Sequence, residues 1–141
     1  MNRAALAQLL SEVVTEAPRR AYAAGSNIFE RGDPALGCYV IERGAVELIL
    51  PCADGTDMVV ELVEAGGLIG LSGSFGQNYI LSARAASETT VAFIGREKVR
   101  HLFDTHAGAK PLMLLALSEN IAHVQRLTSS LLSNSRGDYL F

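Results

Sequence analysis

Residues 66–79 read GGLIGLSGSFGQNY, and this run decides how the rest of the chain is interpreted. Five glycines fall in it: Gly66, Gly67, Gly70, Gly73 and Gly76. Glycine tolerates positive φ and lets backbone N–H groups approach a ligand, and successive N–H groups in such a turn form a concave anion site. Glycine-rich segments between strands are also common as plain turns. The sequence on either side must therefore distinguish a binding loop from a simple turn.

Short β-strands surround the glycine-rich run. Apolar and β-branched stretches bounded by turn residues predict strands over residues 20–23, 27–29, 37–42, 45–50, 58–63, 81–86 and 89–94. Arg43-Gly44 is typical of a tight hairpin turn between two of them. So many short strands at close spacing favour an antiparallel sandwich or barrel over βαβ units.

Helical patterns occupy the two ends of the chain. Residues 4–15 predict an amphipathic helix that ends at Pro18. Residues 96–103 predict a short helix, and a long helix is expected from residue 111 to about residue 133. The remaining residues, 134–141, have no pattern.

The long helix carries an apolar seam that repeats by three and four over nearly three heptads, the a/d rhythm of a coiled coil. Leu115, Ala122 and Leu132 give a second stripe. One of the two stripes can cover the barrel, which leaves the other without a partner inside the chain. We therefore expect a homodimer through this helix, and a single broad stripe that packs within the chain is the alternative. The seam consists of Leu114, Leu117, Ile121, Val124, Thr128 and Leu131.

The length, composition and net charge of the chain exclude several classes of protein. A chain of 141 residues with 49% apolar residues is one domain with a core and is not disordered. Its net charge of −3 lacks the basic footprint of a nucleic-acid binder. No apolar run approaches the roughly 20 residues that span a bilayer, and the N-terminus, with Glu12, is not a signal peptide. Cys38 and Cys52 form no motif, which favours a reduced, cytoplasmic protein.

Candidate catalytic groups are missing from the pattern. A metalloenzyme of the cupin type needs two or three histidines and a glutamate on neighbouring strands, and no predicted strand contains a histidine. Ser72 does not lie in a G-x-S-x-G nucleophile elbow. We expect no enzyme and no protein metal site.

The order of the elements resembles the cyclic-nucleotide-binding domain of the CRP/FNR regulators. The matching segments are Arg31-Gly32-Asp33, residues 39–46, residues 66–75 as the phosphate-binding cassette, Arg84-Ala85 and residues 91–94. The resemblance implies a mainly β fold with flanking helices: a double-stranded β-helix, or jelly roll, of about eight strands. It divides the chain into an N-terminal helix (1–18), the jelly roll (19–95), a short helix plus a long dimerisation helix (96–134) and a tail (135–141), with no DNA-binding domain.

Two positions depart from the cassette of cyclic-nucleotide binders. Those proteins place a Glu for the ribose hydroxyl after the second glycine, where this chain has Leu71, and an Arg for the cyclic phosphate, where it has Tyr79. Each charged hydrogen bond contributes about 1.5–3 kcal/mol, so we do not expect cyclic AMP to be the ligand. The resemblance assigns the ligand site to Gly70, Leu71, Ser72, Gly73, Tyr79, Ile80 and Ser82, with Thr128 and Ser129 of the long helix where the family offers hydroxyls to adenine.

Residues 78–83 look more like the branch of the family that senses oxygen or nitric oxide, whose members have a Tyr in place of the Arg and an apolar pocket. Iron–sulfur members need an N-terminal cysteine cluster, which is absent. Haem stays open as a cofactor, with His101, His106, His123 or a methionine as its axial ligand.

Three functions stay open at this point. The first is an effector-sensing and dimerisation domain that signals through the long helix. The second is a structural dimeric domain without a ligand, and the third is a haem-based gas sensor. Nucleic acid would be contacted only through a domain absent from this chain, which we expect to be either a fragment of a regulator or a stand-alone sensor that acts through a partner.

Overall fold

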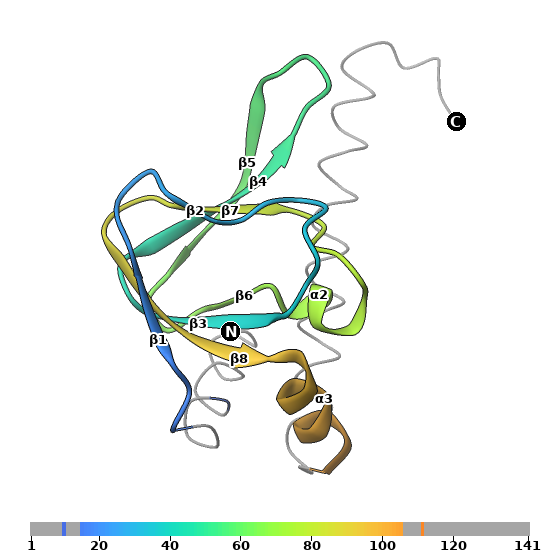
Figure 1. The fold of residues 1–141 in the computed structure, drawn as a ribbon. Helices are drawn as coiled ribbons and strands as arrows, with labels where there is room; N and C mark the ends of the chain where they lie inside the picture. Colours follow the sequence, from blue (N-terminus) through green and yellow to red (C-terminus); the bar gives the residue numbers. More distant parts are fainter. Residues whose placement is uncertain (1–9, 11–14, 106–110, 112–141) are drawn as a thin grey trace.

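Two four-stranded antiparallel sheets form the body of the protein (Figure 1). The computed structural model describes Leu10, residues 15–105 and Pro111. The first sheet has the order β1-β8-β3-β6, and the second has the order β2-β7-β4-β5. The strands of the first are β1 (Arg19–Tyr22), β8 (Thr89–Gly95), β3 (Gly37–Arg43) and β6 (Leu68–Ile69). Those of the second are β2 (Asn27–Phe29), β7 (Ser82–Ala85), β4 (Ala45–Pro51) and β5 (Asp57–Glu64). The predicted mainly β, antiparallel fold is confirmed.

One predicted connection is wrong. Arg43-Gly44 does not close a hairpin, because β3 pairs with β6 and β8 while β4 pairs with β5 and β7. Gly44 instead turns the chain from one sheet to the other with φ +88°, and a Cβ there would lie 2.3 Å from the Glu88 carbonyl oxygen. The hairpin in this part of the chain is β4–β5, which projects from the body (Figure 1).

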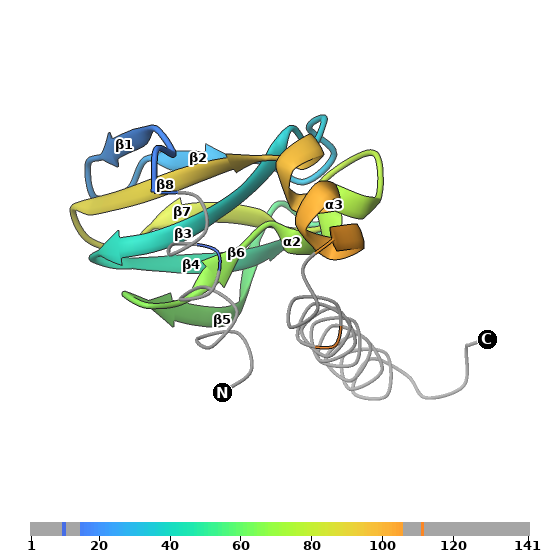
Figure 2. The same cartoon turned by 90° about the horizontal axis from the view of Figure 1, so that it is seen from below.

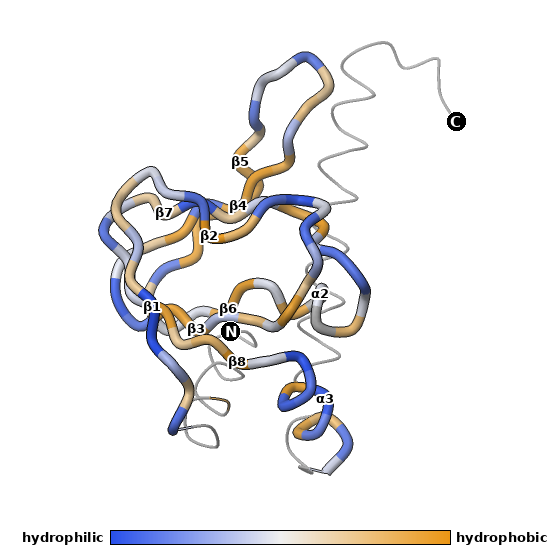
Figure 3. The backbone as a smooth tube through the Cα atoms, in the orientation of Figure 1, coloured by the Kyte–Doolittle hydropathy of each residue, from blue (hydrophilic) through white to orange (hydrophobic). Residues whose placement is uncertain are grey.

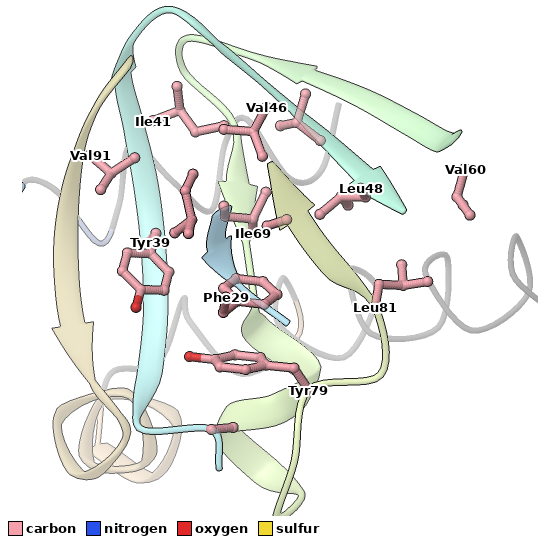
Figure 4. Close-up of a cluster of buried hydrophobic side chains, with 14 residues drawn as sticks. Phe29, Tyr39, Ile41, Val46, Leu48, Val60, Ile69, Tyr79, Leu81 and Val91 are labelled. Atoms are coloured by element: carbon pink, nitrogen blue, oxygen red, sulfur yellow. The ribbon is translucent and has the colours of Figure 1, made fainter. Parts of the chain in front are cut away.

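The inner strands of the first sheet, β3 and β8, are buried on both faces. Successive side chains of a strand point to opposite faces, so Tyr39 and Ile41 of β3 face the second sheet while Cys38 and Val40 face away from it. The inter-sheet cluster consists of Ile28, Phe29, Ala35, Tyr39, Ile41, Val46, Leu48, Val60, Val63, Ile69, Tyr79, Leu81, Ala83 and Val91 (Figure 4). The helix-side cluster, on the other face, consists of Leu10, Ala17, Cys38, Val40, Leu68, Leu71, Ala92, Ile94, Val99 and Leu102. Hydrophobic stretches of the backbone lie on strands of both sheets (Figure 3).

The two described helices lie at the same end of the sheets (Figure 2). Helix α2 (Leu71–Phe75) and strand β6 both fall inside the glycine-rich run, where no regular element was predicted. Helix α3 (Arg96–Thr105) confirms the predicted short helix, and it buries Val99 and Leu102.

Several predictions lie outside the described residues. These are the N-terminal helix apart from Leu10, the long helix with its seam apart from Pro111, and the C-terminal tail. Within the described part of the chain both cysteines are free thiols, and no helix there is long and apolar enough to cross a membrane.

Candidate ligand site

The glycine-rich run passes from β6 into α2 through Gly70. Its φ of +81° lies in the left-handed region that side chains other than glycine rarely adopt. A Cβ at this position would lie 3.1 Å from Cε1 of Tyr79 and 3.4 Å from Cε2 of Phe29. The turn therefore requires Gly70, and the missing Cβ also relieves a tight contact with the Tyr79 ring.

Tyr79 lies inside the protein at the end of this run. Its side chain is 5% exposed, and its ring stacks on that of Phe29 with 3.8 Å between the ring centroids and 15° between the planes (Figure 4). The hydroxyl donates a hydrogen bond of 2.6 Å to the carbonyl oxygen of Gly37, at the start of β3. Both the apolar ring and the polar hydroxyl are thus satisfied within the protein.

Gly73 of α2 touches the same ring. A Cβ at residue 73 would lie 2.8 Å from Cδ1 of Tyr79 and 2.7 Å from Cβ of Ala35. Real Cβ atoms essentially never come so close to another heavy atom. Two glycines of the run therefore form a floor on which the edge of the Tyr79 ring rests.

The backbone around Tyr79 is held by the loop that follows β2. The Tyr79 N–H donates to the Asp33 carbonyl at 3.0 Å, and the Gly32 N–H donates to the Tyr79 carbonyl at 2.9 Å. Arg96, the first residue of α3, donates from its guanidinium to the carbonyls of Gly76 (3.0 Å) and Ala35 (3.3 Å). The segment after α2 is thereby joined both to the Arg31-Gly32-Asp33 loop and to α3.

The titratable groups at this site are phenols. Burial raises the pKa of the Tyr79 hydroxyl well above its ordinary value, and the neighbouring Tyr39 hydroxyl raises it further. Burial likewise raises the pKa of the Tyr39 hydroxyl. Both side chains are neutral around neutral pH.

Leu71, which stands where the resemblance places the ribose-binding Glu, belongs to the helix-side cluster. Val99 and Leu102 of α3 are members of the same cluster. Next to it Phe75 packs on Phe103, with 5.1 Å between the ring centroids. Leu71 thus joins α2 to α3 and is not part of the cluster around Tyr79.

The other predicted ligand residues are spread over the structure. Ile80 is 40% exposed. Ser82 lies on the opposite face of β7 from the inward-facing Ala83, and its hydroxyl accepts a hydrogen bond of 2.9 Å from the Arg31 N–H. The side chain of Ser72, and Thr128 and Ser129 altogether, are outside what the structure describes. The structure brings together Gly70, Gly73 and Tyr79.

Several residues near this site were not predicted from the sequence. Phe29 supplies the stacking platform and Gly37 the acceptor carbonyl. The guanidinium of Arg20 lies 4.4 Å from the ring centroid of Phe93 and 6.0 Å from that of Tyr39, at the β1 edge. The only sequence signal for such a role was a set of aromatic residues on separate strands, which does not reveal that they meet.

One inward-facing carboxylate was also missed. Glu61 of β5 pairs directly with Leu48 of β4, so both side chains lie on the face toward the inter-sheet cluster. Its Oε1 atom is buried. The signal was present in the sequence, since Glu61 interrupts the apolar stretch of residues 58–63.

The candidate haem ligands remain untested. His101 is exposed on α3, whereas His106 and His123 lie outside the described residues. Among the residues that the structure describes, no group of three or more His, Cys, Asp or Glu side chains is arranged to hold a metal ion.

Comparison with known families decides the class of this domain. The model of the cyclic nucleotide-binding domain matches residues 19–106, from β1 to just beyond α3. The chain belongs to this family. The resemblance to the cyclic-nucleotide-binding domain is confirmed.

Individual relatives place the chain near the CRP/FNR regulators. The cAMP-activated global transcriptional regulator CRP of Salmonella typhimurium is 29% identical over 115 residues, which are 80% of this chain and 53% of the relative. This chain therefore spans about half the length of the CRP relatives that it matches. The structure of the c-di-GMP responsive regulator CLP of Xanthomonas campestris has a TM-score of 0.69 at 25% identity, over 96% of this chain and 66% of the other. FixK2 of Bradyrhizobium japonicum shares the fold with a TM-score of 0.70 at 20% identity, over 78% and 55% of the two chains.

Proposed function

We propose that this chain is the effector domain of a CRP/FNR-like regulator and that its cassette does not recognise cyclic nucleotides. The single observation that carries the proposal is the position of Tyr79. Its neutral ring is stacked on Phe29 and rests on Gly70 and Gly73, and its hydroxyl is committed to the Gly37 carbonyl. By the resemblance, this is the position of the cation that binds the cyclic phosphate.

A cyclic nucleotide fits these residues poorly. Its phosphate needs a donor or a cation, and the group that meets it here is a buried phenol whose one proton is already donated. Arg84 of β7 does not replace the missing cation, since its guanidinium pairs with Glu47 at 3.2 Å and Asp57 at 3.5 Å. Arg96 is held by two carbonyls.

The finer features of the regulator belong to this proposal as well. The strand orders β1-β8-β3-β6 and β2-β7-β4-β5 support the expected jelly roll of eight strands. We propose dimerisation through the seam of the long helix, and contact with DNA through a separate domain, as in full-length relatives of this class.

A domain without any diffusible ligand is the second candidate. The same ring favours it, because Tyr79 fills the place that an effector would take. In that case the domain would set the geometry of a dimer without sensing a small molecule.

Calorimetric titration of the purified chain with cyclic AMP tests the proposal. We expect no binding below about 100 μM, because two charged contacts are lost. Cyclic di-GMP, to which the Xanthomonas regulator responds, is titrated as a second ligand in the same experiment. We expect no binding of this cyclic nucleotide either. Micromolar affinity of the unmodified chain for cyclic AMP would contradict the proposal.

A further inference from the structure

We propose that Arg20 and Tyr22 of β1 form a binding site for a small aromatic carboxylate at the outer edge of the first sheet. The proposal goes beyond the proposed function, because neither residue belongs to the glycine-rich run. β1 is the outermost strand of its sheet, next to β8, and its side chains are exposed or partly exposed (Figure 1). A ligand therefore reaches these two side chains without entering the cassette.

Both side chains lie on the inner face of the first sheet. Arg20 pairs with Val91 of β8, and Tyr22 pairs with Thr89. Directly opposed residues of an antiparallel pair point to the same face, and Val91 belongs to the inter-sheet cluster. Tyr22 packs against that cluster and is partly buried, whereas Arg20 is exposed. A guanidinium thus lies at the solvent edge of an apolar and aromatic interior.

Aromatic rings orient the guanidinium of Arg20. Its Cζ atom lies 4.4 Å from the ring centroid of Phe93 and 6.0 Å from that of Tyr39. Stacking on a ring uses the flat face of a guanidinium and leaves its in-plane N–H groups free to donate. The fork of donors is therefore oriented before a ligand arrives, which lowers the entropy lost on binding. This orientation distinguishes Arg20 from an arginine that is surrounded only by water.

No carboxylate within the described part of the chain pairs with this cation. Glu42 accepts a hydrogen bond of 2.9 Å from Arg19, the preceding residue. Arg84 and Arg96 likewise donate to oxygen atoms of the protein. The donors of these three arginines serve the fold, whereas those of Arg20 remain available to an external anion.

Two phenol groups lie near the guanidinium. Burial and the nearby Tyr22 hydroxyl raise the pKa of the Tyr39 hydroxyl, and the charge of Arg20 lowers it, so these polar groups lie close together. Because the Tyr79 hydroxyl donates its proton to the Gly37 carbonyl, the hydrogen bond between the two phenols is donated by Tyr39. The Tyr22 hydroxyl is therefore the phenol that can donate to a ligand beside Arg20.

These groups favour a flat monoanion. A planar guanidinium donates two parallel hydrogen bonds to the two oxygens of a carboxylate, and Tyr22 can donate one more. A second negative charge, as on a phosphate dianion, would not be matched by the adjacent Arg19, which is paired with Glu42. A ring attached to the carboxylate would add to the aromatic contacts of Phe93 and Tyr39. The site therefore suits an aromatic carboxylate.

A nuclear magnetic resonance titration of the isotope-labelled chain with sodium benzoate tests this site. We expect saturable shifts at the Arg20 Nε–H group and at the amides of β1 and β8, with a dissociation constant of about 1 mM because the site is open to solvent. Benzamide, which is neutral and has the same shape, should bind about tenfold more weakly or less. Acetate, which lacks the ring, should also bind more weakly, and sodium chloride at the same ionic strength should cause no saturable shift.

Three variants separate the contributions of the side chains. Arg20→Gln removes the charge and the fork at an exposed position, and it should weaken benzoate binding by about tenfold or more. Tyr22→Phe removes only the hydroxyl and should weaken binding by about threefold. The matched control is Arg19→Gln, since Arg19 pairs with Ala92 and lies on the other face of β1. This control should leave the affinity for benzoate unchanged.

The inference is overturned if about 50 mM benzoate causes no saturable shift, if benzamide binds as tightly as benzoate, or if Arg20→Gln keeps the affinity of the unmodified chain. Shifts confined to the glycine-rich run would contradict it too, because they would place the ligand in the cassette. The proposed function fails separately, through tight binding of cyclic AMP to the unmodified chain.

Discussion

At the scale of the residue, Tyr79 changes what the neighbouring glycines do. In a phosphate-binding loop glycine brings N–H groups toward an anion, whereas here Gly70 and Gly73 make room for a ring. The consequence is steric and electrostatic together. A charged side chain at residue 79 would have to be buried among Phe29, Tyr39 and the rest of the inter-sheet cluster, which is unfavourable without a partner.

Gly73→Ala tests the steric role of the glycine floor. Alanine normally stabilises a helix over glycine by about 1 kcal/mol. Here the new Cβ would lie under 3 Å from Tyr79 and from Ala35, and such overpacking destabilises by about 1–3 kcal/mol. We expect net destabilisation in urea denaturation.

Gly95→Ala is the matched control for this substitution. A Cβ at residue 95 would meet nothing within 4 Å, and its φ is not in the left-handed region. We expect stability equal to or slightly above that of the unmodified protein. A Gly73→Ala protein as stable as Gly95→Ala would show that the ring does not rest on the floor as described.

At the scale of the element, the strands could be predicted and the interior of the glycine-rich run could not. Strands such as β3 and β8 carry enough β-branched and apolar residues to be recognised, whereas β6 has two residues and α2 five, too few for a period to show. For the same reason, the sequence could not predict that the Leu71 side chain points into the helix-side cluster. The error at Arg43-Gly44 has another cause: its turn chemistry suits a hairpin, but the pairing of β3 and β4 is set by packing between sheets.

Arg96 connects two of these elements, and its removal is a prediction at this scale. Arg96→Met would remove the donor from the part-buried carbonyl of Ala35 and from the exposed carbonyl of Gly76, which should destabilise the protein by about 1 kcal/mol. Hydrogen exchange should become faster at the amides of Gly32 and Tyr79, which hold the loop after α2. Amides in the β3–β8 ladder should keep their protection.

Lys98→Met provides the control, since Lys98 is an exposed cation on the same helix. It should change neither the stability nor the exchange of the loop. If Lys98→Met and Arg96→Met accelerate exchange of the Tyr79 amide equally, the two carbonyl contacts of Arg96 do not hold the loop.

At the scale of the whole molecule, the dimer interface is a prediction from the sequence alone. The seam residues lie outside the described part of the chain. We expect Ile121→Asp to make the protein monomeric in sizing chromatography, because a dimer would bury an unpaired carboxylate. A change on the side of the same predicted helix opposite the seam, Glu119→Gln, should leave the dimer intact. A dimer that survives Ile121→Asp would place the interface elsewhere.

The central claim concerns what occupies the glycine-rich site, and a crystal structure of the unmodified chain grown with millimolar cyclic AMP tests it most directly. The account predicts electron density for the Tyr79 ring between Phe29 and the glycine floor, with the hydroxyl on the Gly37 carbonyl and no nucleotide there. Density for a cyclic nucleotide on Gly70 and Gly73, with Tyr79 displaced, would contradict it.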